Sequence, residues 1–332
     1  MFTNAIPFVV LAGHGFPLPA GIAQASPDME HASSSDEGLG SEPRSLNGKA
    51  RKVAAMWSPQ HYISIGNKAG VDATVLENAA HQIDRVLNGP HHLPSILTLM
   101  HLAKRIGVSY EYIRAIVERR DGDSYKHFRI RKRSGGSRVI SVPNVTLMRV
   151  QRWIAVHVLR EIPVHSSSFA FAPGSSIAKC AMEHRRARWL VKMDVADFFG
   201  SITELQVYRV FHALGYQPLI SFELARLCTQ VPEKSEKHAL RAWKVWRSRN
   251  AIEKYQQKFM GRLPQGAPTS PMLSNLIMRG IDSKIVATAK EYGVVYTRYS
   301  DDITFSTRSD SFDRTKAKAL IGDISAILKA SG

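Results

Sequence analysis

Short runs of β-branched and aromatic residues alternate with helical patterns along the C-terminal half of the chain. Residues 293–299 and 303–307 are rich in Val, Tyr, Thr and Phe, which predicts two strands joined by a tight turn. Residues 189–193 predict a further strand, while residues 272–278 and 316–328 have the apolar spacing of helices. The pattern therefore predicts a mixed fold of helices and short strands.

The first 55 residues follow a different pattern. An apolar run at residues 5–12 is followed by prolines and glycines, and residues 32–38 are small and polar. A signal peptide would begin with a basic segment and keep its apolar run unbroken, and neither is found here. We interpret residues 1–55 as a disordered leader, and we expect translation to begin at Met56, where the first globular pattern starts.

Residues 56–120 predict an N-terminal helical region. Two short amphipathic patterns within residues 97–113 are separated by Gly107, and Ser109 is placed to cap the second helix. Two helices joined in this way also describe a helix-turn-helix, so a DNA-binding regulator is an alternative function. Binding to an operator-like duplex without any nucleotide would distinguish such a regulator from an enzyme.

A basic segment precedes the predicted central strands. Residues 128–143 form two basic, strand-like arms around a Ser-Gly-Gly turn, which predicts a β-hairpin. Lys132 and Arg138 are the best placed cations to grip the phosphates of a nucleotide. Contact with the phosphates of a nucleic acid template is the alternative, and the sequence does not separate the two.

Three aspartates lie at the ends of predicted strands. Asp194 follows the strand at residues 189–193, and Asp301 and Asp302 occupy the turn that follows Tyr299. Three carboxylates so placed can hold two divalent metals, the standard arrangement for in-line attack on a phosphate. Hard oxygen ligands suit Mg²⁺, for which Mn²⁺ is a substitute. An ordinary solvated turn is the alternative, because Asp is common in turns.

Charge and cysteine content narrow the classes of partner and the cellular compartment that are expected. The chain has 45 Lys and Arg against 28 Asp and Glu, and the formal net charge of +17 favours a polyanionic partner such as nucleic acid. Cys180 and Cys228 give neither a disulfide framework nor zinc-ligand spacing, which fits the cytoplasm. No run approaches the roughly 20 uninterrupted apolar residues that span a bilayer, so no membrane partner is expected.

Three blocks of the sequence, in this order, resemble the catalytic motifs of reverse transcriptases: residues 194–199, 262–276 and 299–302. The loop from Gln265 to Pro271 and residues 168–177 resemble bacterial retron-type enzymes more than viral ones. Retron-type enzymes carry an Asn-Ala-x-x-His element before the first aspartate, and the matching stretch here begins with Cys180 instead of asparagine. This substitution leaves group II intron and defence-associated relatives open.

The resemblance implies an α+β fold of the right-hand polymerase type. Residues 121–332 would form the fingers and a palm with an antiparallel sheet, and the sequence would stop before a thumb. It also implies a role for each site residue. Asp194, Asp301 and Asp302 would be catalytic and bind two Mg²⁺ ions, Lys132 and Arg138 would contact the triphosphate, and Gln265 and Gly266 would lie beneath the nucleotide.

Phe199 lies five residues after Asp194, where the family places a ring that crowds the sugar 2′ position. That role implies a DNA product, whereas an ordinary core aromatic is the alternative. The expected function is therefore RNA-directed DNA synthesis from dNTPs on a structured non-coding RNA, in bacterial antiviral defence. An effector protein or a separately encoded thumb would be a further partner. A template-independent defence polymerase, a group II intron-type enzyme and an inactive, truncated RNA-binding protein are the alternatives.

Overall fold

The computed structural model describes residues 5–8, 58–120, 122, 124–131, 137–231, 244–245 and 252–331 of the chain. Apart from a short strand at residues 5–8, the predicted leader therefore lies outside the described residues. The boundaries proposed at residues 55 and 120 stay predictions.

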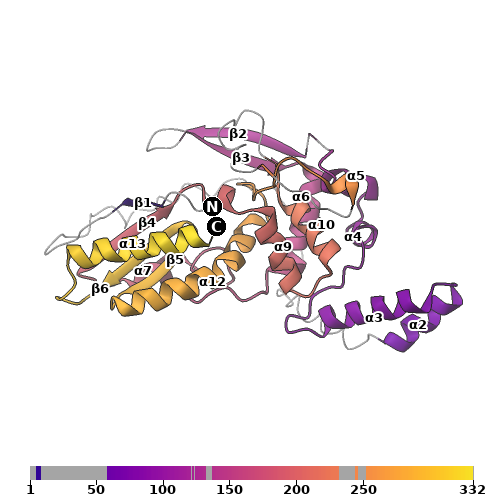
Figure 1. Ribbon diagram of the computed structural model, residues 1–332, viewed down its shortest axis with the longest axis horizontal. Coiled ribbons are helices and arrows are strands. Elements are labelled where there is room, and N and C mark those ends of the chain that lie inside the picture. The colour runs from indigo at the N-terminus through magenta and orange to yellow at the C-terminus, as the bar shows by residue number, and fades with distance from the viewer. Residues whose placement is uncertain are drawn as a thin grey trace, which may run out of the picture.

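A four-stranded antiparallel sheet forms the centre of one half of the molecule (Figure 1). Its strands lie in the order β1-β4-β6-β5, and their bounds are β1 (Ala5–Phe8), β4 (Trp189–Val195), β6 (Asp302–Thr307) and β5 (Val295–Tyr299). The three strands predicted from β-branched and aromatic runs are thus confirmed, and so is the antiparallel arrangement. The fourth strand, β1, pairs with the outer edge of β4.

A helix packs against each face of the sheet at β5, and successive residues of this strand point to opposite sides. On one face, Tyr296 and Arg298 of β5 reach Asp282 of α12 (Ser270–Glu291). Helix α13 (Arg314–Ala330) packs against α12 and buries Ala317, Leu320, Ile324 and Leu328 at helical spacing. On the other face, β5 contacts α7 (Ile177–Glu183), and Thr297 lies within hydrogen-bond distance of His184, which ends that helix.

A helical half adjoins the sheet and shares one continuous hydrophobic core with it (Figure 1). Helix α10 (Pro218–Cys228) is buried along most of its length and packs against the helices around it. The helices of this half are α2 (Pro59–Lys68), α3 (Ala73–Leu87), α4 (Leu99–Ile106), α5 (Tyr110–Val117), α6 (Val145–Ile154), α8 (Phe198–Ser201) and α9 (Glu204–Ala213). A π-helical turn, η1 (Ala155–Leu159), continues α6, and a 3-10 turn, η2 (Glu253–Tyr255), precedes the second catalytic block.

The two helices predicted around Gly107 are present as α4 and α5. Gly107 ends α4 with a φ of 72°, a left-handed conformation that glycine adopts without strain. The Ser109 hydroxyl accepts a hydrogen bond of 3.3 Å from the Tyr112 backbone N–H and so caps α5.

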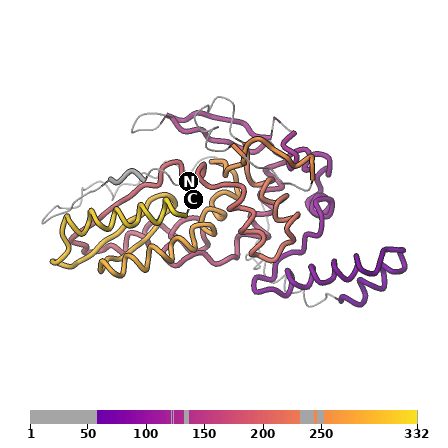
Figure 2. The backbone as a smooth tube through the Cα atoms, viewed as in Figure 1, coloured from indigo at the N-terminus to yellow at the C-terminus, as the bar shows by residue number. Residues whose placement is uncertain are grey.

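The predicted basic hairpin is present as β2 (Tyr125–Arg131) and β3 (Ser137–Pro143), which pair along their full length. Its tip, residues 132–136, lies outside the described residues. Figure 2 shows the stretch that leads into α12 running beside this hairpin. In the part of the chain that the structure describes, no helix is long and apolar enough to cross a bilayer.

Candidate active site

The sheet brings the predicted aspartates together at one end of β4 and β6. Asp194 and Asp302 are direct partners in the antiparallel register, and Asp301 precedes Asp302 in the turn. Lys192 and Asp194 share one face of β4, and their partners Thr304 and Asp302 share the same face of β6. The Lys192 Nζ lies 3.8 Å from an Asp302 carboxylate oxygen. Asp194 and Asp302, from distant parts of the chain, therefore lie opposite each other on one face of the sheet, and both are exposed.

The turn between β5 and β6 is held in an unusual conformation. Ser300 has a φ of 61°, a left-handed conformation that side-chain-bearing residues rarely adopt, and it is only 7% exposed. Its carbonyl accepts a hydrogen bond of 3.0 Å from the Arg298 guanidinium. Such local strain persists where the surrounding structure enforces it, and it is common at functional sites.

A fully buried ion pair anchors this turn to α12. Arg298 donates from Nε and an Nη to the two carboxylate oxygens of Asp282, at 2.9 and 2.8 Å. The Tyr296 hydroxyl donates to the same carboxylate at 2.7 Å. Burial opposes the guanidinium charge, but hydrogen bonding and the charge of Asp282 outweigh it and raise the pKa of Arg298. Sequence reasoning missed this pair, although Arg298 lies only three residues before Asp301.

A histidine supports the hairpin from the face that carries the aspartates. The two ring nitrogens of His184 each lie 2.6 Å from a hydroxyl, Ser306 Oγ on one side and Thr297 Oγ1 on the other. The Cys180 thiol donates to the same Thr297 hydroxyl at 3.3 Å. Burial lowers the pKa of His184, which favours its neutral form. Cys180 and His184, the two ends of the motif that departs from the retron pattern, therefore act on β5 and β6.

The carboxylates of Asp194, Asp301 and Asp302 are ligands of the type that a hard divalent cation prefers. They supply oxygen ligands only, and Mg²⁺ commonly takes a few carboxylates and completes its shell with waters and substrate phosphates. Among the described residues, however, no group of three His, Cys, Asp or Glu side chains lies close enough together to hold an ion. In this part of the chain Asp194 and Asp302 form an exposed pair of carboxylates rather than a closed cage.

The glutamine loop lies against the basic hairpin. The backbone N–H of Ser141 in β3 donates to the Gln265 carbonyl at 2.7 Å. Gly266 has a φ of +117°, and a Cβ there would come within 3.0 Å of Ile140 Cγ2 and 3.1 Å of the Ser141 carbonyl. Glycine is favoured on both counts, because a side chain would be strained at this φ and would crowd the hairpin.

The remaining predicted residues lie on separate elements. Phe199 is half-buried on α8, with its ring centroid 5.4 Å from that of Phe198 and 6.4 Å from that of Phe171. Arg138 is exposed on β3, opposite Ile130 of β2. Lys132 lies outside the described residues.

Two exposed apolar side chains share the hairpin face that carries Arg138. Phe128 and Ile130 are 53% and 43% exposed, and they pair with Ile140 and Arg138. Since Ile140 approaches Gly266, this face is directed toward the glutamine loop. Alternation of apolar and basic residues along β2 was the signal that could have identified it in the sequence.

Known proteins resemble the same region of the chain. The family described as reverse transcriptase (RNA-dependent DNA polymerase) matches residues 130–332. The retron Mx162 reverse transcriptase of Myxococcus xanthus is 35% identical over 208 residues, which cover 62% of this chain and 41% of the relative. The retron Ec86 reverse transcriptase of Escherichia coli is 30% identical over 219 residues, which cover 65% of this chain and 59% of the relative.

The retron Mx65 reverse transcriptase of Myxococcus xanthus is 32% identical over 224 residues, which cover 64% of this chain and 48% of the relative. The chain thus spans about half the length of the curated relatives it matches. The matched region contains the three aspartates, the strained turn and the glutamine loop. The chain belongs to the reverse transcriptase family, and within that family it is of the retron type.

Proposed function

We propose that this chain carries the catalytic centre for RNA-templated DNA synthesis, with Asp194, Asp301 and Asp302 as the ligands of two Mg²⁺ ions. The observation that carries the proposal is the register of the sheet, which pairs Asp194 with Asp302, the residue that follows Asp301. When bound, the two ions would neutralise phosphate charge and activate the primer hydroxyl. Mn²⁺ would bind the same oxygen ligands.

The rest of the site positions the nucleotide. The fingers hairpin would bring Arg138, with Lys132, to the triphosphate, while Gln265 and Gly266 would lie beneath the base and sugar. The contact between β3 and the glutamine loop supports this assignment, because it brings the hairpin and the loop close enough to contact the same nucleotide. Positioning of this kind is the main contribution that a protein makes to phosphoryl transfer.

The surplus of cations supports an RNA partner. With 45 Lys and Arg against 28 Asp and Glu, the chain would bind a polyanion at many points. By similarity to the retron reverse transcriptases, we propose that the template is a structured non-coding RNA, and that the enzyme acts in the bacterial cytoplasm as part of antiviral defence. Primer extension on a defined RNA template, with the four dNTPs supplied singly, tests this function.

Phe199→Ala is expected to let the enzyme accept ribonucleotides. Removing the ring relieves a clash with the 2′ hydroxyl without adding a contact, so incorporation of dNTPs should change little while incorporation of rNTPs rises about tenfold or more. The measurement is the ratio of kcat/KM for a dNTP to that for the matching rNTP. This ratio is independent of the fraction of active enzyme. An unchanged ratio would show that Phe199 is only a core aromatic.

A further inference from the structure

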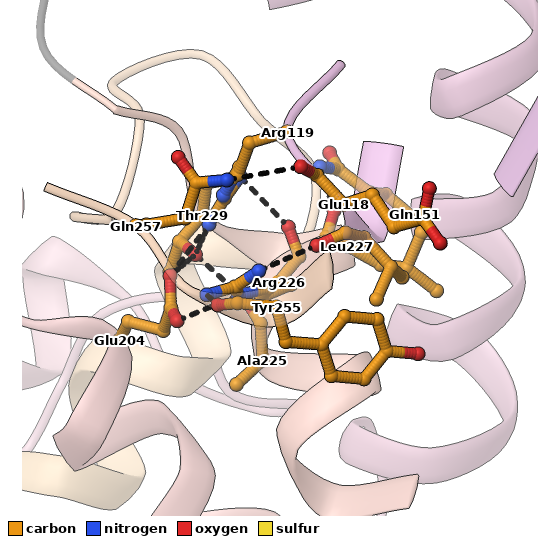
Figure 3. A network of polar contacts seen from close by, with 11 residues as sticks. Glu118, Arg119, Gln151, Glu204, Ala225, Arg226, Leu227, Thr229, Tyr255 and Gln257 are labelled. Atoms are coloured by element: carbon orange, nitrogen blue, oxygen red, sulfur yellow. Dashed lines mark hydrogen bonds and ion pairs between the residues drawn. The ribbon is translucent and has the colours of Figure 1, made fainter. Parts of the chain in front are cut away.

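A cluster of buried charges lies in the helical half, where α9, α10 and the end of α5 meet (Figure 3). One carboxylate oxygen of Glu204 accepts from Arg226 Nε at 3.0 Å, and the other accepts from an Arg119 guanidinium nitrogen at 2.6 Å. Glu204 is 8% exposed and Arg226 is 3% exposed. Buried ion pairs add little net stability on average, so stability alone is a weak reason for three charges at this position.

The cluster also binds the backbone around it. Arg226 donates to the carbonyls of Val117 and Tyr255 at 2.8 and 2.7 Å. Arg119 donates to the carbonyl of Thr229 at 2.5 Å and to its hydroxyl at 2.7 Å. The guanidinium groups therefore join α5, the end of α10 and the turn η2 to one carboxylate.

The chain that leads to the glutamine loop passes directly over this cluster. The Glu204 backbone N–H donates to the Gly261 carbonyl at 2.8 Å. A Cβ at Gly261 would lie 2.5 Å from an Arg119 guanidinium nitrogen and 2.6 Å from a Glu204 carboxylate oxygen. The Gly261 backbone therefore lies in contact with the charged groups, and any side chain here would displace them.

The same stretch is then fixed to the residues that follow Phe199. Arg262 exchanges two backbone hydrogen bonds of 2.9 Å with Gln230, and the Leu263 N–H donates to the Ile202 carbonyl at 3.0 Å. Ile202 follows α8, which carries Phe199, and it precedes the start of α9 at Glu204. Two residues beyond Leu263 the chain reaches Gln265. Only a short segment separates Phe199 from Glu204, and another separates Gly261 from Gln265. The cluster thus contacts the chain close to both of these site residues.

We propose that Arg119, Glu204 and Arg226 are positioning residues that set the spacing between Phe199 and Gln265, and through it the choice between deoxyribonucleotides and ribonucleotides. The inference rests on the proposed function, in which these two side chains flank the nucleotide. An ionised carboxylate that accepts from two guanidinium groups holds α9 and the Gly261 backbone in one arrangement. Small displacements of positioning groups have large kinetic effects, about a hundredfold for about 1 Å.

Glu204→Gln tests the proposal, with Glu118→Gln as the matched control. Glu118 is also a buried carboxylate held by two arginines, Arg114 at 2.7 Å and Arg120 at 2.5 Å. Its side chain has no recorded hydrogen bond to residues 261–265. Glu204→Gln is expected to lower the dNTP to rNTP ratio of kcat/KM about tenfold, toward the value of Phe199→Ala. Glu118→Gln is expected to keep the parent's ratio.

Hydrogen exchange of the peptide that contains residues 261–266 gives a readout that does not depend on activity. Faster exchange there in Glu204→Gln than in Glu118→Gln, together with a lower ratio, supports the proposal. Faster exchange with an unchanged ratio overturns it, because the cluster would then have a structural role alone. Unchanged exchange also overturns it, because the cluster would then not hold residues 261–266 in place.

The variant could fail to fold, or the parent could be inactive, and each outcome has its own test. If Glu204→Gln does not fold, Arg119→Lys replaces it, since lysine keeps the charge but cannot donate to Glu204 and Thr229 from one planar group. If the parent adds neither dNTP nor rNTP, the proposed function fails. Hydrogen exchange alone then tests whether the cluster holds residues 261–266 in place. Unchanged exchange in the variant overturns the proposal.

Discussion

Asp301→Asn and Asp194→Asn are each expected to lower nucleotide incorporation by more than about a thousandfold while leaving RNA affinity nearly unchanged. Metal ions stabilise the transition state of phosphate attack by several kcal/mol, and about 1.4 kcal/mol is tenfold in rate. We expect RNA affinity to depend instead on the surplus of cations distributed over the chain, 45 Lys and Arg against 28 Asp and Glu. Single-turnover incorporation and RNA binding at several salt concentrations measure the two effects separately.

Asp310→Asn is the matched control for these variants. Asp310 follows the other end of β6 and forms an ion pair with Arg188 on the surface. The substitution removes the same charge from the same hairpin region, and incorporation should stay within about twofold of the parent, as expected for a surface pair. Full activity in Asp301→Asn or Asp194→Asn would contradict the metal assignment.

Asp282→Ala is expected to destabilise the protein by about 3–5 kcal/mol, because it leaves the buried Arg298 guanidinium without its counter-charge. Both side chains of the pair are fully buried, at 0% exposure. Arg298 also holds the strained turn through the Ser300 carbonyl, so the variant should lose activity at temperatures where it is still mostly folded. Urea unfolding followed by circular dichroism measures the free energy of unfolding.

Glu161→Ala provides the comparison for that measurement. Glu161 pairs with Arg160 at 3.8 Å on the surface, and both side chains are exposed. Such pairs contribute little, so the free energy of unfolding should change by less than about 1 kcal/mol. A loss of only about 1 kcal/mol in Asp282→Ala as well would mean that the buried pair does not anchor the turn.

Much of the sheet could be predicted because strand residues are identified by local composition. The runs around Asp301 and before Asp194 are β-branched and aromatic, and both became strands. Their register could not be predicted, since pairing depends on packing of the whole sheet. The sequence therefore indicated that the three aspartates belong together, and the structure placed Asp194 opposite Asp302.

The buried ion pairs could not be predicted from the sequence. Arginine and aspartate are usually exposed, so nothing in the local pattern marks Arg298 and Asp282 as fully buried partners. The same holds for Arg119 and Glu204, which are 85 residues apart in the chain. Contacts between distant residues follow from the tertiary fold, and the distant aspartates could be grouped in advance only because their motifs resemble those of a known family.

The most direct test of the central claim is single-nucleotide addition to a primer on RNA templates that differ only in the templating base. With Mg²⁺ present, we predict that each template directs addition of its complementary dNTP, and that Asp301→Asn abolishes all four additions. Addition of the same nucleotides whatever the templating base would contradict RNA-templated synthesis and indicate a template-independent polymerase. Addition by the parent no greater than by Asp301→Asn would contradict a catalytic role for the aspartates.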